Sequence, residues 1–347
     1  MNFCALPGII RPLSVLCLGT ANCGSAYTRE ESFALLDAFA EAGGNFLDTA
    51  HVYADWLPKG HGASERTVGE WLRTRGVRDN FAVATKGGHP RLETMEKSRL
   101  RPEDLTRDLT ESLERLGTDR VDLYWLHRDD PAVPVGEILA ALNEHQASGR
   151  IRALGASNWR PARLKAVAEY AEAHGLTGFV ASQIGWSLAV PNVVQGQWYD
   201  ALYMDAEALE YHCMGGLQVI PFSPQAGGFF AHPYDTADAK YALYHNEVNA
   251  GRWDRVQRLA EEHGVSANAI ALAYILEHPC GGSAIIGPRT VEQLQDSVQV
   301  VGLRLSEAER EFLEKGHLTL SPALRADPPL GSGGASVEVN PSVRTTL

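Results

Sequence analysis

The chain has 347 residues, 44% of them hydrophobic and 21% charged, a balance typical of soluble globular proteins. Its net charge of −12, without a long basic run, argues against nucleic acid or an anionic membrane as a partner. No apolar run is long enough to predict a transmembrane helix, and the N-terminus lacks the pattern of a signal peptide. The five cysteines are widely spaced and show no metal-ligand pattern, so we expect a reduced, cytoplasmic protein without a metal site.

Short β-type runs alternate with amphipathic helical stretches along the chain. Strands are expected at 15–19, 45–49, 81–86, 121–127, 151–157, 179–184, 218–223 and 283–287. Helices are expected at 29–42, 64–75, 103–116, 135–148, 161–174, 199–214, 266–278 and 290–300. Eight strand-then-helix units with largely apolar strands favour an α/β fold with a parallel sheet, and eight such units can close into a (β/α)8 TIM barrel.

A doubly wound open sheet is the competing architecture. That fold usually carries a G-x-G-x-x-G sequence after its first strand, whereas residues 19–24 read GTANCG and lack the spacing. We therefore favour a single barrel domain over residues 1–317. A long loop at 224–252 follows the seventh strand and is expected to act as a lid. The Pro- and Gly-rich tail at 318–347 is expected to be poorly ordered.

Four polar residues fall at one rim of the predicted barrel, where the strands end and where barrel enzymes place their active sites. Asp48 and Tyr53 follow the second strand, Lys86 ends the third and His127 ends the fourth. Each alone is more often a solvated loop residue or a hydrogen-bonded core residue, but together they suit proton transfer to a carbonyl oxygen. A free tyrosine has a pKa of about 10, and a nearby ammonium group lowers it. Because none of these side chains supplies a hydride, a redox cofactor would have to do so.

Several stretches of the chain resemble the aldo-keto reductases. They are FLDTAHVY (46–53), GASERTVGEWL (62–72), FAVATK (81–86), DLYWLH (122–127), GASNW (155–159), SQIGWSL (182–188), PFSP (221–224) and IIGPRTVEQLQDSV (285–298). The resemblance implies a (β/α)8 barrel that binds NAD(P)H without a Rossmann fold and reduces a carbonyl group to an alcohol. It also implies that Tyr53 is the general acid, that Lys86 and Asp48 lower its pKa, and that His127 orients the substrate.

The same resemblance implies a set of cofactor-binding residues. They are Gly19, Ser157, Asn158, Gln183, Phe222, Ser223, Gly287, Arg289, Gln293 and Asp296. In this set Ser157, Asn158 and Gln183 hold the nicotinamide carboxamide, Phe222 stacks on its ring, and Ser223 contacts the diphosphate. Arg289 stands where many members carry a lysine that meets the 2′-phosphate, and a guanidinium can also bind phosphate. NADP(H) is therefore favoured, and NAD(H) stays possible.

Polar and aromatic residues surround this rim in the neighbouring loops: Asp55, Trp56, His89, Arg128 and Trp186. They indicate a small-molecule pocket rich in hydrogen-bonding groups, which suits a hydroxylated carbonyl compound such as a keto-sugar. The alternative to an enzyme is a non-catalytic relative that binds a nicotinamide nucleotide as a sensor or regulatory subunit. The complete Asp, Tyr, Lys and His set argues against it, because a pure binding protein has no need of Tyr53. The sequence leaves the oligomeric state open.

Overall fold

The structure is a computed structural model that describes residues 1–193 and 200–316. Eight strands form one parallel sheet in the order β10-β3-β4-β5-β6-β7-β8-β9. The strands are β3 (Leu16–Gly19), β4 (Phe46–Asp48), β5 (Ala82–Gly87), β6 (Val121–Leu126), β7 (Ile151–Ser157), β8 (Ala181–Gln183), β9 (Gln218–Val219) and β10 (Ala284–Ile286). A parallel bridge between Phe222, just beyond β9, and Ile285 of β10 joins the two edges of the sheet. These features confirm the predicted (β/α)8 barrel.

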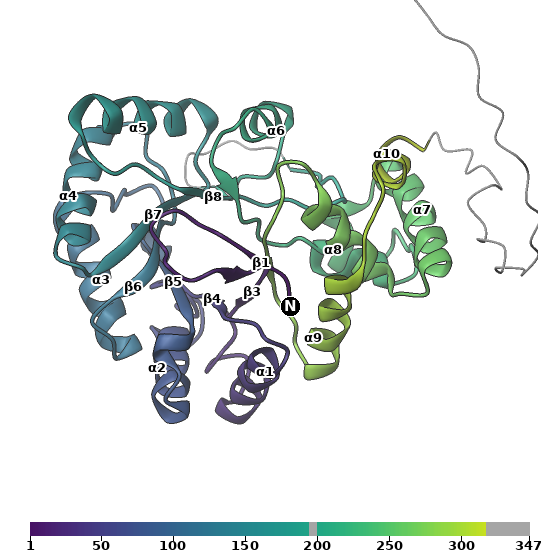
Figure 1. Cartoon of the computed structure of the whole chain (residues 1–347), viewed down its shortest axis with the longest axis horizontal. Helices are drawn as coiled ribbons and strands as arrows, with labels where there is room; N and C mark the ends of the chain where they lie inside the picture. Colours follow the sequence, from purple (N-terminus) through teal and green to yellow (C-terminus); the bar gives the residue numbers. More distant parts are fainter. Residues whose placement is uncertain (194–199, 317–347) are drawn as a thin grey trace, which may run out of the picture.

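Helices surround the strands, with α1 to α5 following one another around one side of the barrel (Figure 1). They are α1 (Arg29–Glu41), α2 (Ala63–Arg75), α3 (Pro102–Leu116), α4 (Val135–Ala147), α5 (Pro161–His174), α6 (Ala206–Cys213), α7 (Glu247–His263), α8 (Ala267–Glu277), α9 (Val291–Val298) and α10 (Glu307–Lys315). Helix α3 shows why these segments are helical. Pro102 occupies its first turn, its leucines recur every three or four residues on the buried face, and Gly117 ends it in the left-handed conformation.

The core has two layers. Helices pack on the outside of the strands through one large apolar cluster, while a smaller cluster fills the inside of the barrel. A short antiparallel hairpin of β1 (Phe3–Cys4) and β2 (Leu13–Ser14), absent from the sequence prediction, contributes to this inner cluster. Its Leu6, Ile9 and Leu13 pack with Ala82 and Ala153, near the starts of their strands. The hairpin therefore closes the end of the barrel where the strands begin, opposite to the rim that carries Asp48 and Lys86.

The structure differs from the prediction mainly after β8. Helix α6 begins at Ala206, later than the expected 199, and β9 is shorter than the expected strand. The expected loop at 224–252 contains two 3-10 helices, η3 (Ala226–Ala231) and η4 (Ala239–Tyr244), and the first turns of α7. Four of its aromatic side chains are buried, which explains why the segment is folded: Phe229, Phe230, Tyr241 and Tyr244. Its action as a lid stays a prediction.

The remaining short elements are the 3-10 helices η1 (Arg78–Asn80), η2 (Leu92–Thr94) and η5 (Gln299–Gly302). The expected tail at 318–347 lies outside the described residues, so the proposed domain boundary stays a prediction. Among the described helices, none combines the length and the apolar character needed to cross a membrane.

Candidate active site

Side chains alternate between the two faces of each strand, and this places Asp48 of β4 and Lys86 of β5 together inside the barrel. Asp48 is paired in register with Ala84, and Lys86 lies two residues further along β5, so all three side chains point to the same face. The ammonium group of Lys86 donates hydrogen bonds to the Asp48 carboxylate, to the carbonyl oxygen of Thr49 at 2.9 Å and to the hydroxyl oxygen of Tyr53 at 2.9 Å. Asp48 and Lys86 are both 1% exposed. The strand ends thus hold a buried ion pair whose cation touches the tyrosine.

The second oxygen of Asp48 is also held. Trp125 donates from its indole nitrogen and Gln183 from its side-chain amide, each at 3.1 Å. The indole lies across the barrel because Gly155 has no side chain: a Cβ there would sit 2.4 Å from the Trp125 ring. With donors on both of its oxygens, the carboxylate of Asp48 is fixed in position beside Lys86.

Electrostatics leave Tyr53 protonated. Burial raises the pKa of the Tyr53 hydroxyl above its ordinary value, and the charge of Lys86 reduces that rise without cancelling it. The expected net lowering of the Tyr53 pKa is therefore wrong for this structure, because removal from water outweighs the ammonium group. Burial also opposes the charge of Lys86, but attraction to Asp48 and Tyr53 outweighs it and raises the pKa of Lys86. Lys86 is cationic, and since the Tyr53 oxygen accepts its hydrogen bond, the phenolic proton is left for another acceptor.

Two histidines lie beside the tyrosine. The ring of His127, directly after β6, meets the Tyr53 ring edge-on at 5.9 Å and the His89 ring at 4.8 Å. Burial, followed by the positive charges nearby, lowers the pKa of His127 well below its ordinary value and that of His89 to about 4. Within the described residues, the Nδ1 atom of His127 is buried without a hydrogen-bond partner. A neutral imidazole offers one N–H donor, which suits the oxygen of a carbonyl group.

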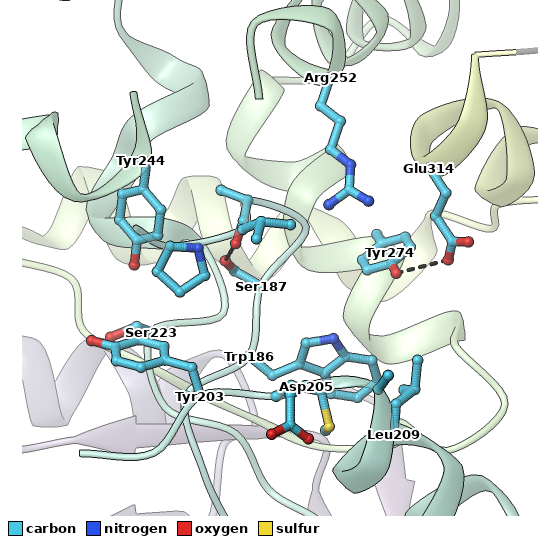
Figure 2. A pocket seen from close by; sticks show the side chains of 16 residues that line it. Trp186, Ser187, Tyr203, Asp205, Leu209, Ser223, Tyr244, Arg252, Tyr274 and Glu314 are labelled. Carbon is cyan, nitrogen blue, oxygen red and sulfur yellow. Dashed lines mark hydrogen bonds between the residues drawn. The ribbon is translucent and has the colours of Figure 1, made fainter. Parts of the chain in front are cut away.

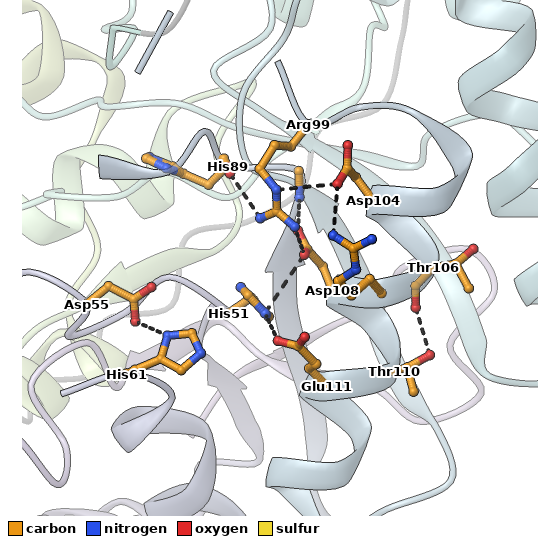
Figure 3. Close-up of polar contacts among 12 residues, drawn as sticks. His51, Asp55, His61, His89, Arg99, Asp104, Thr106, Asp108, Thr110 and Glu111 are labelled. Carbon is orange, nitrogen blue, oxygen red and sulfur yellow. Dashed lines mark hydrogen bonds and ion pairs between the residues drawn. The ribbon is translucent and has the colours of Figure 1, made fainter. Parts of the chain in front are cut away.

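Polar contacts fasten the loop that carries Tyr53 to helix α3 (Figure 3). His51 lies 2.7 Å from Glu111, and the nearby Arg115 pairs with the buried Glu65 at 3.1 Å. Asp55, expected to meet substrate, instead pairs with His61 at 2.9 Å, which reduces its capacity to bind a ligand. Trp56 is 52% exposed, with its ring 6.4 Å from that of Tyr53.

The residues expected to hold a nicotinamide lie at the ends of β7 and β8, and their polar groups are partly engaged. The amide of Asn158 donates to the carbonyl oxygen of His127 at 3.1 Å, and its oxygen accepts from the backbone N–H of Leu202 at 2.8 Å. Asn158 therefore connects three loops. Its own backbone is left-handed, with a φ of 62°. Gln183 is held on Asp48, while Ser157 is buried beside it.

The next two expected positions open toward solvent. Phe222 is half-buried, and the backbone at Ser223, Gly227 and Gly228 is left-handed. A Cβ at Gly227 would meet nothing within 4 Å, so a phosphate group has room to approach the main chain there. By contrast, a Cβ at Gly19 would lie 3.0 Å from Ile285, so this glycine serves the packing of β3 against β10.

Positions after β10 form a cationic end to this surface. Arg289 and Gln293 are exposed, Asp296 is half-buried, and Thr290 caps the start of α9. The backbone N–H of Arg289 donates to Gln293 at 2.8 Å, while no carboxylate of the described residues forms a salt bridge with its guanidinium. Exposed Gly287 precedes it. The flat aromatic ring, the open glycine loop and the exposed cation have the chemistry that a nucleotide cofactor requires.

A cavity of about 340 Å³, called the second cavity here to separate it from the site around Tyr53, lies between the loop after β8 and helices α7, α8 and α10 (Figure 2). Trp186, expected in the substrate pocket, lines this cavity together with Arg252 and Tyr274, and Tyr53 is not in the lining. Because Ser223, expected to contact the cofactor diphosphate, also lines it, the cavity adjoins the expected cofactor surface. Arg128 follows His127 and donates to its carbonyl oxygen at 2.9 Å.

Sequence reasoning missed Trp125, and it also missed the ion pair between Glu65 on α2 and Arg115 on α3. Trp125 lies two positions before His127, so the alternation of the strand already placed it on the inner face below the active site. Glu65 and Arg115 gave no local signal, because they come from two helices and meet only in the fold.

Comparison with known proteins identifies the family of this chain. The Aldo/keto reductase family profile matches residues 15–315. The norsolorinic acid reductase stcV of Emericella nidulans is 34% identical over 86% of this chain and 76% of its own length. The uncharacterized oxidoreductase YrpG of Bacillus subtilis is 30% identical over 85% of this chain and 89% of its own. The putative aryl-alcohol dehydrogenase AAD14 of Saccharomyces cerevisiae is 28% identical over 87% and 82%. The chain therefore belongs to the aldo/keto reductase family.

Proposed function

We propose that the protein is an NAD(P)H-dependent reductase that converts an aldehyde or ketone to an alcohol, or catalyses the reverse reaction. The observation that carries the proposal is the buried series of hydrogen bonds from Asp48 through Lys86 to Tyr53, which leaves the tyrosine proton available. Family membership and the names of the relatives support an oxidoreductase in general. All five cysteines are free thiols, which is consistent with the cytoplasmic location we propose.

The cofactor, when bound, supplies the hydride. The chain's own residues handle the proton and the developing charge. Tyr53 donates its proton to the carbonyl oxygen, and the Lys86 ammonium, at 2.9 Å, stabilises the phenolate that remains. Asp48 keeps Lys86 charged and in place. His127 donates a hydrogen bond to the same carbonyl oxygen and orients it toward Tyr53. In the direction of alcohol oxidation, the phenolate of Tyr53 accepts the proton.

The cofactor preference we propose is NADP(H) over NAD(H). An additional 2′-phosphate carries negative charge, and the exposed guanidinium of Arg289, beside the capped start of α9, supplies a cation for it. NADH lacks that phosphate, so it would bind through the diphosphate and nicotinamide positions alone. It remains a usable second cofactor.

We propose an aryl aldehyde or ketone as the substrate. Trp56 and His89 place aromatic rings around Tyr53 and His127, and one relative is named as a putative aryl-alcohol dehydrogenase. The keto-sugar expected from the sequence is the second candidate. Arg128, whose guanidinium interacts electrostatically with Tyr53, favours it, whereas the engagement of Asp55 by His61 counts against it.

The test is cofactor oxidation followed by absorbance, with NADPH or NADH and matched panels of aryl aldehydes, aryl ketones and keto-sugars. The proposal predicts turnover with NADPH and a higher kcat/KM for the aryl compounds. Binding of NADPH without turnover of any carbonyl or alcohol would instead establish the non-catalytic sensor. A higher kcat/KM for the keto-sugars would replace the aryl assignment and leave the reductase itself standing.

A further inference from the structure

We propose that Cys213, His278 and Cys280 form a binding site for a thiophilic metal ion, with Zn²⁺ as the best match, separate from the active site. The two sulfur atoms and one imidazole nitrogen lie within 4.8 Å of one another. The Sγ atom of Cys280 is 3.3 Å from Nδ1 of His278. Two thiols and one imidazole are the donor set that Zn²⁺ accepts in proteins.

The fold brings these donors together from two elements that are far apart in the sequence. Cys213 is the last residue of α6, and His278 directly follows α8. Beyond it the chain turns back sharply, because the N–H of Gly281 donates to the carbonyl oxygen of His278 at 2.8 Å. Only glycine fits there: a Cβ on Gly281 would lie 1.9 Å from the carbonyl oxygen of Ile275. This turn directs Cys280 toward His278 and toward the end of α6.

The spacing of the three donor atoms is close to what the ion requires. With Zn–S bonds of about 2.3 Å and Zn–N bonds of about 2.0 Å, donors in a tetrahedral site lie roughly 3.3–3.8 Å apart. The His278 and Cys280 pair already has that separation, and Cys213 needs to approach by no more than about 1.5 Å, within the reach of a side-chain rotation. Cys213 is exposed, so an ion has a path from solvent, and water can fill the fourth position.

Aromatic contacts hold the imidazole in position. Trp186 meets the His278 ring edge-on at 4.9 Å, and Tyr274 meets it at 5.8 Å. Restricting the ring reduces the entropy that the ligand loses when it binds an ion, and such surroundings tune metal affinity. Both rings also line the second cavity, so a bound ion would fix one wall of that cavity.

The experiment titrates the metal-free, reduced full-length protein with Co²⁺ and then displaces the cobalt with Zn²⁺. Thiolate-to-cobalt charge-transfer absorption reports ligation by sulfur directly and does not depend on any catalytic activity. The proposal predicts one Co²⁺ per chain, complete displacement by Zn²⁺, and a rise in Tm on metal addition. Cys213→Ser and His278→Gln should each weaken the metal by about 100-fold or more, beyond the loss expected for residues that only support a ligand.

Cys4→Ser is the matched control, because Cys4 is also partly buried and contacts Ser283 rather than the cluster. It should leave the absorption and the stoichiometry unchanged. Since Cys213 is exposed, Cys213→Ser should fold normally, and circular dichroism verifies this. The proposal is overturned if no charge-transfer absorption develops, or if it persists in Cys213→Ser. It is equally overturned if Cys213 and Cys280 are isolated as a disulfide and the reduced protein binds no metal.

Discussion

The site around Tyr53 and the second cavity are built in opposite ways. At the ends of β4, β5 and β6, regular strands place Asp48, Lys86 and His127, and every charge of the buried pair has a partner. Beyond β8, irregular segments and helix ends form the walls, and the Nε atom of the buried Arg252 guanidinium lacks a partner within the described residues. Strand register fixes side-chain positions to within a fraction of an ångström, as proton transfer requires. None of the residues that line the second cavity lies in a strand, so strand register does not fix the positions of its walls.

Removing the cation of the buried pair should have the largest effect. Lys86→Met leaves Asp48 buried without its counter-charge, so the free energy of unfolding should fall by about 3–5 kcal/mol. Turnover should fall by about 100- to 10,000-fold, because Tyr53 loses the group that stabilises its phenolate. Urea unfolding and steady-state kinetics measure the two effects.

The matched control is Arg258→Met, which breaks an exposed pair with Glu262 one turn away on α7. Such surface pairs contribute about 0.3–0.5 kcal/mol. If Lys86→Met cost no more stability than Arg258→Met, the buried pair would not differ from a surface pair in its contribution to stability. That result would contradict the claim that the site around Tyr53 depends on a buried ion pair.

Arg289→Ala tests the cationic end of the active-site surface. Loss of charge-assisted hydrogen bonds should weaken NADPH by about 1.5–3 kcal/mol, or roughly 10- to 150-fold, and NADH much less. Fluorescence titration of both cofactors measures this, with the exposed Arg107→Ala on α3 as the control. Equal losses for NADPH and NADH would show that Arg289 does not contact the 2′-phosphate.

His89→Gln should make the protein less sensitive to acid. Burial lowers the pKa of His89 to about 4, so between about pH 6.5 and 4 the unfolded chain binds a proton that the folded chain excludes. Folding stability therefore falls as the pH decreases through that window, and at pH 5 this residue accounts for a loss of about 2 kcal/mol relative to pH 8. The glutamine variant should lack this contribution in urea unfolding at both pH values. An unchanged pH dependence, equal to that of the exposed-site variant His232→Gln, would contradict the assignment.

The smallest effect is expected in the second cavity. Tyr274→Phe removes a hydrogen bond to Glu314 of 2.8 Å and should cost about 0.5–1.5 kcal/mol of stability, with kcat for carbonyl reduction unchanged. Thermal unfolding and the reductase assay check both. A kcat reduced in proportion to that of Lys86→Met would place this cavity within the active site and remove the distinction between the two regions.

The sequence predicted the site at the strand ends better than the region after β8. The strand ends carrying Asp48, Lys86 and His127 were predictable because strands of regular hydrophobicity alternate with helices, and barrel enzymes use that rim. The inward direction of Trp125 needed only the period of the strand, whereas its hydrogen bond to Asp48 depends on the closed barrel. The balance of effects on Tyr53 was not predictable, since it depends on how completely the fold removes the hydroxyl from water.

The region after β8 resisted prediction for a physical reason. Its helix α7 begins inside a stretch rich in Gly, Pro and aromatic residues, which reads locally as a loop and becomes ordered by burying Phe230 and Tyr241. The contact between Cys213 and the turn at 278–280 joins two helix ends about 65 residues apart, and no local pattern encodes it. Tertiary packing decides such segments.

The most direct test of the central claim, that Tyr53 is the proton donor of a carbonyl reductase, is turnover of NADPH with an aryl aldehyde by Tyr53→Phe. The substitution removes only the hydroxyl that accepts the Lys86 hydrogen bond. We predict a loss of about 100- to 10,000-fold in kcat, the usual contribution of general acid catalysis, with NADPH binding retained in a fluorescence titration. A variant that kept more than about a tenth of the wild-type kcat while folding normally would contradict the claim, because some other group would then supply the proton.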